Sequence, residues 1–337
     1  MLSCSIPAPD KMSAVEPEVT IQMQPEQFAA ARSESSLLWL LGQPHLEEYL
    51  SFVSRRVVGG AELPTFALAE EWRAANDRYF ELEQIEAGDA DRITVRALPS
   101  RLAALAQIVR ADRWFQATFA ALPTTIEMVE LDRLVVWQGQ IDDRFAGLAG
   151  DHLGAHPQPA ALFRYCLPVQ RDPPPFTIRR LSTDRYQIVS EASDMAALTP
   201  RLLDTAQCSM FANSGPVAAA LAIPVSFGAN FMSAIRSDNR VLLHNGYHRA
   251  YALRALGLRY APCIIQTVTR RDELKFAADT RVASDPAFYF RAARPPMLRD
   301  FFDPLLVKRL QVFPIKTVID IQITASSWSA SDLSIER

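Results

Sequence analysis

The stretch from 240 to 257 constrains the fold more than any other part of the chain, because it sets the order strand, tight turn, helix. Residues 241–243 form a short apolar run that is typical of a buried strand, and Asn245-Gly246 is a turn dipeptide. The helix is predicted to begin near Tyr247 and to end before the glycine that closes the stretch. A second strand is predicted at 263–268, so the whole unit is β-turn-α-β.

The turn gathers groups that favour an anion at one helix N-terminus. The first N–H groups of a helix have no acceptor within it, and they carry a partial positive charge. We expect Gly246 to remove the Cβ that would hinder a ligand. His248 and Arg249 follow in the first helical turn and His244 precedes it, which predicts a phosphate site. The alternative is an ordinary hairpin-to-helix connection with surface His and Arg side chains, since glycine turns before helices are common.

The run His244-Asn-Gly-Tyr-His-Arg249, with Ala252-Leu253 and Leu256-Gly257 behind it, resembles the signature of the ParB/sulfiredoxin superfamily over 223–268. That signature is a strand, a turn of the D-G-x-H-R or G-E-R-R type, a helix with Ala and Leu on one face, a glycine, and a strand preceded by proline. Members include CTP-hydrolysing DNA-partition proteins, ATP-using sulfinic-acid reductases and free-serine kinases. The resemblance implies that ATP or another nucleotide binds with Mg²⁺. The phosphate-binding residues that it implies are His244, Asn245, Gly246, Tyr247, His248 and Arg249.

The turn departs from each branch of this superfamily at one position. Tyr247 stands where the sulfinic-acid reductases have a cysteine, and Asn245 stands where the serine kinases have an acid. The pair His248-Arg249 replaces the two arginines of the DNA-partition proteins. The resemblance therefore implies a phosphate site and leaves its reaction unassigned.

A general base or a Mg²⁺ ligand would have to come from another segment, because the turn has no carboxylate. The run 126–137 predicts one or two strands, and the polar residues after it are similar to the start of a ParB-like domain. The acids that this similarity brings toward the turn are Glu130, Asp132, Asp142 and Asp143. The resulting catalytic candidates are His248, Asp142 and Glu130. The alternative for Asp142 and Asp143 is that they cap the next segment.

The pattern of apolar residues predicts an α+β fold with a helical N-terminal region. The predicted parts are a disordered tail at 1–33, a helical region at 34–122, a ParB/sulfiredoxin-like domain at 123–270 with an insertion at about 150–220, and a C-terminal extension at 271–337. Helices are predicted at 45–53, 67–87, 100–121, 195–210, 217–221 and 273–283. A hairpin is predicted at 176–189, a second hairpin through 237–239, and a final strand at 317–323.

Composition sets further limits on the function. The formal net charge of −3 gives no general attraction to nucleic acid, so DNA association is not expected. The four cysteines include no C-x-x-C pair, and no metal site is expected. No apolar run reaches the roughly 20 residues of a transmembrane helix, and no signal-peptide pattern opens the chain, so we expect a cytoplasmic protein without a membrane partner.

Two hypotheses follow for the function. The first is a nucleotide-binding enzyme, an NTPase or a small-molecule phosphotransferase, whose partner is a nucleotide or another phosphate-bearing small molecule. The second is a ligand-binding or regulatory module of the same fold that does not turn over its ligand. The missing acid at Asn245 favours the second hypothesis, and the sequence does not predict an oligomeric state.

Overall fold

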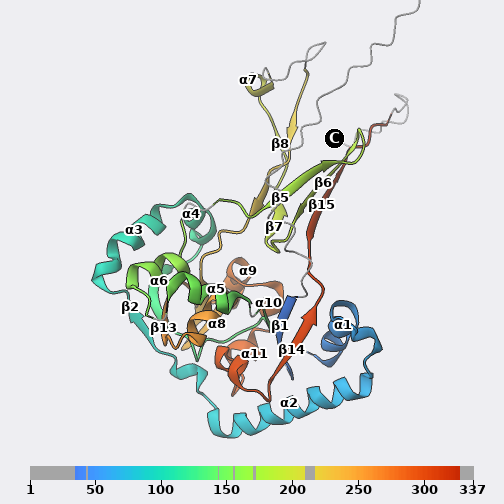
Figure 1. Cartoon of the computed structure of the whole chain (residues 1–337). Helices are drawn as coiled ribbons and strands as arrows, with labels where there is room; N and C mark the ends of the chain where they lie inside the picture. Colours follow the sequence, from blue (N-terminus) through green and yellow to red (C-terminus); the bar gives the residue numbers. More distant parts are fainter. Residues whose placement is uncertain are drawn as a thin grey trace, which may run out of the picture. The chain divides into compact units, whose positions relative to one another are not determined.

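The computed structural model describes residues 35–42, 45–142, 144–154, 156–169, 172–208 and 217–326 (Figure 1). The protein is α+β, as predicted. Its described residues divide into two compact units. Of the described residues, those within 35–173 and 227–315 belong to the main unit, and those within 174–226 and 316–326 belong to the small unit.

A sheet of five strands in the order β12-β11-β13-β3-β2 forms the centre of the main unit. Its strands are β2 (Val95–Ala97), β3 (Thr124–Glu130), β11 (Ser233–Ser237), β12 (Arg240–Asn245) and β13 (Tyr260–Val268). The predicted hairpin is confirmed, because β11 and β12 pair antiparallel. The chain then passes through helix α8 (Tyr247–Ala255) and returns as β13, which lies parallel to β11. The predicted β-turn-α-β unit is thereby confirmed.

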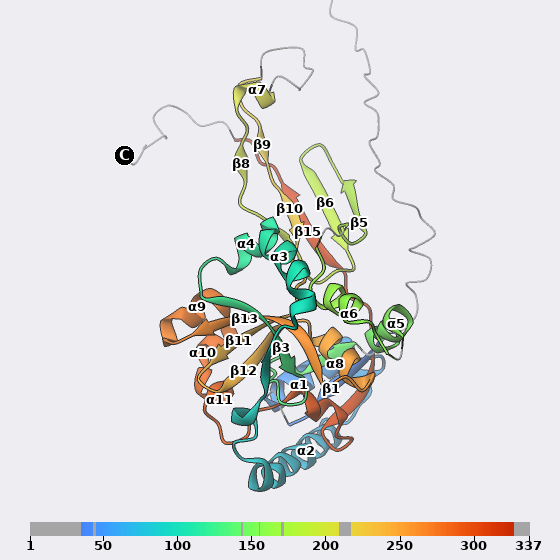
Figure 2. The same cartoon turned by 90° about the vertical axis from the view of Figure 1, so that its left-hand side faces the viewer.

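Alternate residues of β12 face opposite sides of this sheet. Val241 and Leu243 belong to the larger hydrophobic cluster, which also contains Leu253 of α8. Leu242 belongs to a second cluster, which contains Val282. Figure 2 shows the sheet between α8 on one side and α9, α10 and α11 on the other. A strand buried on both faces requires a continuous apolar run, which is what β12 has.

A second sheet, in the order β14-β1-β4, completes the main unit. Its strands are β1 (Ser35–Leu40), β4 (Gln140–Asp142) and β14 (Val307–Val312). Trp39 of β1 lies opposite Lys308 on one side and Gln140 on the other. The predicted division into an N-terminal helical region, a central domain and a C-terminal extension therefore does not describe this unit, since one sheet takes a strand from each of them.

The remaining elements of the main unit are mostly helical. The α-helices are α1 (Leu46–Arg56), α2 (Thr65–Glu86), α3 (Ala103–Ala111), α4 (Arg113–Phe119), α5 (Arg144–Leu153), α6 (Pro159–Cys166), α9 (Leu274–Ala277), α10 (Thr280–Ser284) and α11 (Pro286–Phe290). The short 3-10 helices are η2 (Gly60–Glu62), η3 (Ala90–Arg92), η4 (Ser100–Leu102), η5 (Arg271–Glu273) and η6 (Leu298–Phe302). The helix predicted at 100–121 is broken at Asp112, whose side chain accepts the N–H groups of Trp114 (2.8 Å) and Phe115 (3.1 Å) and starts α4. The helix predicted at 273–283 is likewise divided, into α9 and α10.

The small unit consists of short strands. In its described residues they are β5 (Phe176–Arg180), β6 (Arg185–Ser190), β7 (Met195–Ala197), β8 (Arg201–Leu202), β9 (Leu221–Ala222), β10 (Val225–Phe227, whose last residue belongs to the main unit) and β15 (Thr317–Gln322), together with the helix α7 (Thr205–Cys208). The predicted 176–189 hairpin and the final strand are confirmed, because β6 pairs with both β5 and β15. The unit begins at Pro174, later than the predicted insertion, and it also includes the last strand.

The helices predicted at 195–210 and 217–221 are wrong over most of their length. Leu198 N donates to Pro224 O (2.8 Å), and Leu203 N donates to Ala220 O (2.8 Å). The backbone of the first segment therefore pairs with the returning chain, and a helix would have needed those same N–H groups. Pairing with the returning chain therefore overrides the local helical pattern of this region.

Among the described residues, no helix combines the length and the apolar character needed to cross a bilayer.

A buried ion pair joins distant parts of the main unit. Arg294 and Asp300 have side chains that are 2% and 1% exposed, and two hydrogen bonds of 2.6 and 2.7 Å connect them. Arg294 also donates to Glu86 at the end of α2 (2.9 Å). Removing one partner of such a pair is costly because a buried charge loses compensation, and Arg294 would then have only Glu86 as an acidic partner.

We expect Asp300→Ala to lower the free energy of unfolding by at most about 3–5 kcal/mol, because Arg294 would remain buried and charged with Glu86 as its remaining acidic partner. Urea denaturation followed by circular dichroism measures this loss. The control is Asp272→Ala, which removes the partner of Arg270 from an exposed pair and is expected to cause no measurable loss. Equal stability of the two variants would show that the buried pair contributes nothing to the fold.

Candidate functional site

The turn between β12 and α8 forms as the sequence predicts. Gly246 is the N-cap of α8 and has a left-handed backbone, with φ at 97°. The first hydrogen bond of the helix runs from Ala250 N to Gly246 O (2.8 Å). Asn245 lies opposite Ser233 of β11, beside an irregularity in the register. The sheet thus fixes where the N-terminus of α8 lies.

Gly246 does not open space for a ligand, which corrects the expectation from the sequence. A Cβ at this position would lie 3.1 Å from Cγ of Met232 and 3.2 Å from its Cα. The N–H of Gly246 is also engaged, since it donates to Oδ1 of Asn245 (2.7 Å). A glycine is needed here because of the left-handed φ and the close packing of Met232.

Arg249 has a structural role that the sequence did not indicate. The residue is 8% exposed. Its Nη1 donates to the carbonyls of Cys166 (3.0 Å) and Tyr165 (3.3 Å) at the end of α6, and its Nη2 donates to Oδ1 of Asn230 (2.9 Å). A cation at a helix C-terminus stabilises that end, so Arg249 joins α6 to α8.

Tyr247 and His248 bring a second polar segment to the turn. The hydroxyl of Tyr247 donates to Leu243 O and accepts the N–H of Trp137 (3.2 Å), and burial raises the pKa of this hydroxyl. The N–H of Asp142 donates to Nδ1 of His248 (3.1 Å), which assigns the proton of a neutral ring to Nε2. The chain from Trp137 to Asp142 therefore lies along the first turn of α8.

His244 lies just before the turn and carries no positive charge at neutral pH. Burial lowers the pKa of its imidazole, and the charge of Asp279 offsets this only in part. Within the part of the chain that the structure describes, its Nδ1 is buried without a hydrogen-bond partner. His244 therefore adds a neutral polar group to this region.

Of the four predicted acids, the structure brings Asp142 to the turn. Asp132 lies elsewhere and pairs with Arg254 (2.8 Å). Asp143 falls outside the described residues.

Glu130 does not approach the turn, which corrects its assignment as a catalytic candidate. It lies opposite Tyr260 at the end of β3, and two strands separate β3 from β12. Its carboxylate is 3% exposed and accepts from Arg133 (2.8 Å) and from the N–H of Thr94 (2.9 Å). Burial acts to raise the pKa of Glu130, but these partners hold it below its usual value. Glu130 is a structural ion-pair residue.

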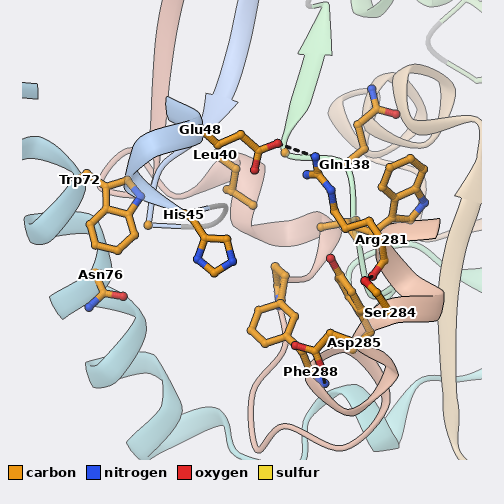
Figure 3. Close-up of a pocket in the computed structure, with 16 residues that line it drawn as sticks. Leu40, His45, Glu48, Trp72, Asn76, Gln138, Arg281, Ser284, Asp285 and Phe288 are labelled. Atoms are coloured by element: carbon orange, nitrogen blue, oxygen red, sulfur yellow. Dashed lines mark hydrogen bonds and ion pairs between the residues drawn. The ribbon is translucent and has the colours of Figure 1, made fainter. Parts of the chain in front are cut away.

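A cavity of about 410 Å³ in the main unit is a feature that the sequence did not predict (Figure 3). It lies between the start of α1, one side of α2, the loop at 136–139 and helices α10 and α11. Trp137 lines it, and the ring of the same residue meets Tyr247 edge-on with 6.0 Å between ring centroids. No motif marks the lining, because its residues come from separate segments of ordinary composition. Among the described residues, no group of three or more His, Cys, Asp or Glu side chains is placed to hold a metal ion.

Comparisons with protein-family models, with curated proteins and with solved structures find no match to this chain.

We expect Gly246→Ala to destabilise the protein by about 1–3 kcal/mol more than Gly257→Ala. Both glycines have a positive φ, but a Cβ at Gly257 would meet nothing within 4 Å, whereas one at Gly246 would meet Met232. Chemical denaturation of the two variants measures the difference. A Met232→Ala background should remove only the part of the difference that comes from Cγ, because alanine keeps the Cα and Cβ that lie 3.2 Å from the added methyl group. Equal losses for the two glycine variants in the wild-type background would contradict the role given to Met232.

Proposed function

We propose that this protein binds a nucleotide, or another phosphate-bearing small molecule, at the first turn of α8. One observation carries the proposal: two polar segments that are far apart in the sequence meet at one helix N-terminus. The hydrogen bond from Asp142 N to His248 Nδ1 joins them at 3.1 Å. The resemblance to the ParB/sulfiredoxin superfamily, which holds phosphates at such a turn, supports the same assignment.

The exposure of the side chains indicates that a phosphate-bearing ligand reaches the turn over Asn245 and His248. Asn245 is exposed and His248 is half-buried, whereas Gly246 is buried against Met232. A helix of nine residues such as α8 carries a partial positive charge at its N-terminus, which favours a phosphate there. The proposed ligand contacts are therefore Asn245, His248 and the backbone of the first turn, while Tyr247 and Arg249 hold the turn in place.

We propose that Mg²⁺ arrives with the nucleotide. Mg²⁺ in nucleotide sites is bound by phosphate oxygens, waters and one or two carboxylates. Asp142 is the carboxylate on the segment beside the turn, and no cluster of three metal-binding side chains exists among the described residues. This donor set fits an ion bound mainly by the phosphates.

Binding without turnover is the form of the proposal that the geometry favours. Arg249 donates to carbonyls of α6, and Glu130 is paired with arginines. In the catalytic form, an NTPase or phosphotransferase, His248 would contact the transferring group and Asp142 would orient the attacking group. No contact in the described chain favours DNA association. We also propose a cytoplasmic location, because the three described cysteines are buried free thiols.

A thermal-shift panel of ATP, ADP, CTP and GTP, with and without Mg²⁺, tests the proposal. A ligand at a hundredfold excess over its dissociation constant adds about 2.7 kcal/mol to the stability of the native state. We expect at least one nucleotide to raise the unfolding midpoint and His248→Asn to reduce that rise. Asn at this position retains an acceptor for Asp142 N, so the variant keeps the fold.

The matched control is His152→Asn on α5, an exposed histidine away from the turn, which should keep the full shift. The absence of a shift with every nucleotide would refute the proposal, as would an equal effect of the two variants. Phosphate release with Mg²⁺ then separates the two forms, because a shift without release indicates a binding module.

A further inference from the structure

The cavity in the main unit has a wall rich in aromatic side chains. Trp72 comes from α2, Trp137 from the loop after β3, and Phe288 and Tyr289 from α11. In Figure 3, His45, Trp72 and Asn76 extend into the space from one side and Arg281, Asp285 and Phe288 from the other. Aromatic faces carry negative potential, which attracts cations in addition to apolar groups.

The charged groups of the lining leave an excess of negative charge. Glu48 pairs with Arg281, and both side chains are partly exposed. Asp285 adds a second carboxylate, whose Oδ1 accepts the N–H of Phe288 (3.2 Å) and so caps α11. Two carboxylates and one guanidinium give the lining a net formal charge of −1 when its histidine is neutral.

The volume and the mixed lining are those of a small-molecule site. Ligand cavities enclose about 300–1,000 Å³ and combine apolar walls with a few polar groups. The cavity here measures about 410 Å³, and polar side chains such as Asn76, Gln138 and Ser284 lie between its aromatic groups. This arrangement can orient a ligand that has one flat apolar part and one charged end.

We propose that the cavity binds a small organic cation, an amine attached to an aromatic or similarly flat apolar group. The ammonium group lies near Asp285 and the aromatic faces, and the apolar group packs against Trp72 and Phe288. The proposal uses none of the groups assigned to the nucleotide at α8. Failure of nucleotide binding would leave it unaffected, and its own failure would leave the α8 site unaffected.

Three probes of the same shape and different charge test this site in the full chain: 2-phenylethylamine, 2-phenylethanol and 3-phenylpropanoate. Trp72 and Trp137 line the cavity, so tryptophan fluorescence reports binding. We expect the amine to bind most tightly, the alcohol more weakly and the carboxylate weakest. Trp72→Phe should reduce the amplitude of the fluorescence change, because it removes one of the two tryptophans that line the cavity.

Asp285→Asn is the decisive variant, since Asn also caps helices and the substitution removes only the charge. We expect this substitution to lower the affinity for the amine about 5- to 10-fold and to leave the affinity for the alcohol unchanged. Asp272 is an exposed acid outside the cavity, so Asp272→Asn should change neither the affinity for the amine nor that for the alcohol. If nucleotides raise the unfolding midpoint of Asp285→Asn as much as that of the wild type, the two sites are separate.

Three results would each overturn the proposal. The first is equal affinity for the amine and the alcohol, the second is tighter binding of the carboxylate, and the third is an amine affinity that Asp285→Asn does not alter. The absence of a fluorescence change with all three probes at about 10 mM, a concentration above most ligand-site dissociation constants, would also overturn it.

Discussion

The main unit depends on the pairing of Val135 with the free edge of β12. Val135 N donates to Val241 O (3.0 Å), and Leu243 N donates to Val135 O (2.8 Å). The same short segment bonds the chain near Met297, because Leu298 N donates to Leu134 O (2.8 Å). Fully buried backbone groups need partners, and this segment supplies them to the central sheet and to the chain that leads into β14. It therefore connects the two sheets of the unit.

The continuation of this segment lies between the two candidate sites. Trp137 lines the cavity, while its N–H bonds the hydroxyl of Tyr247 in the first turn of α8. Three residues later the chain enters β4 and reaches His248 through the N–H of Asp142. The α8 turn and the cavity thus share one segment of backbone, which lines the cavity at Trp137 and bonds the first turn of α8 at Trp137 and Asp142.

Several residues that suggest chemistry in the sequence support the structure instead. Arg249 bonds the end of α6, and Glu130 lies in an ion pair with Arg133. A buried charged side chain is tolerated where its hydrogen bonds are satisfied, and both residues meet that condition. In this chain the chemical character of a side chain therefore says less about its role than the groups that it contacts.

The sequence by itself determined the α+β class, the β12-turn-α8-β13 unit, both hairpins and the helices α1, α2 and α8 of the main unit. Each of these predictions depends on the periodicity of apolar residues, on a turn dipeptide or on a helix cap. These signals operate between residues that are close together in the chain. Tertiary structure alone decided that most of 195–208 is not helical, that Glu130 lies away from the turn, and that a cavity forms beside Trp137. These outcomes depend on contacts between residues far apart in sequence, which override local propensity and which no local pattern specifies.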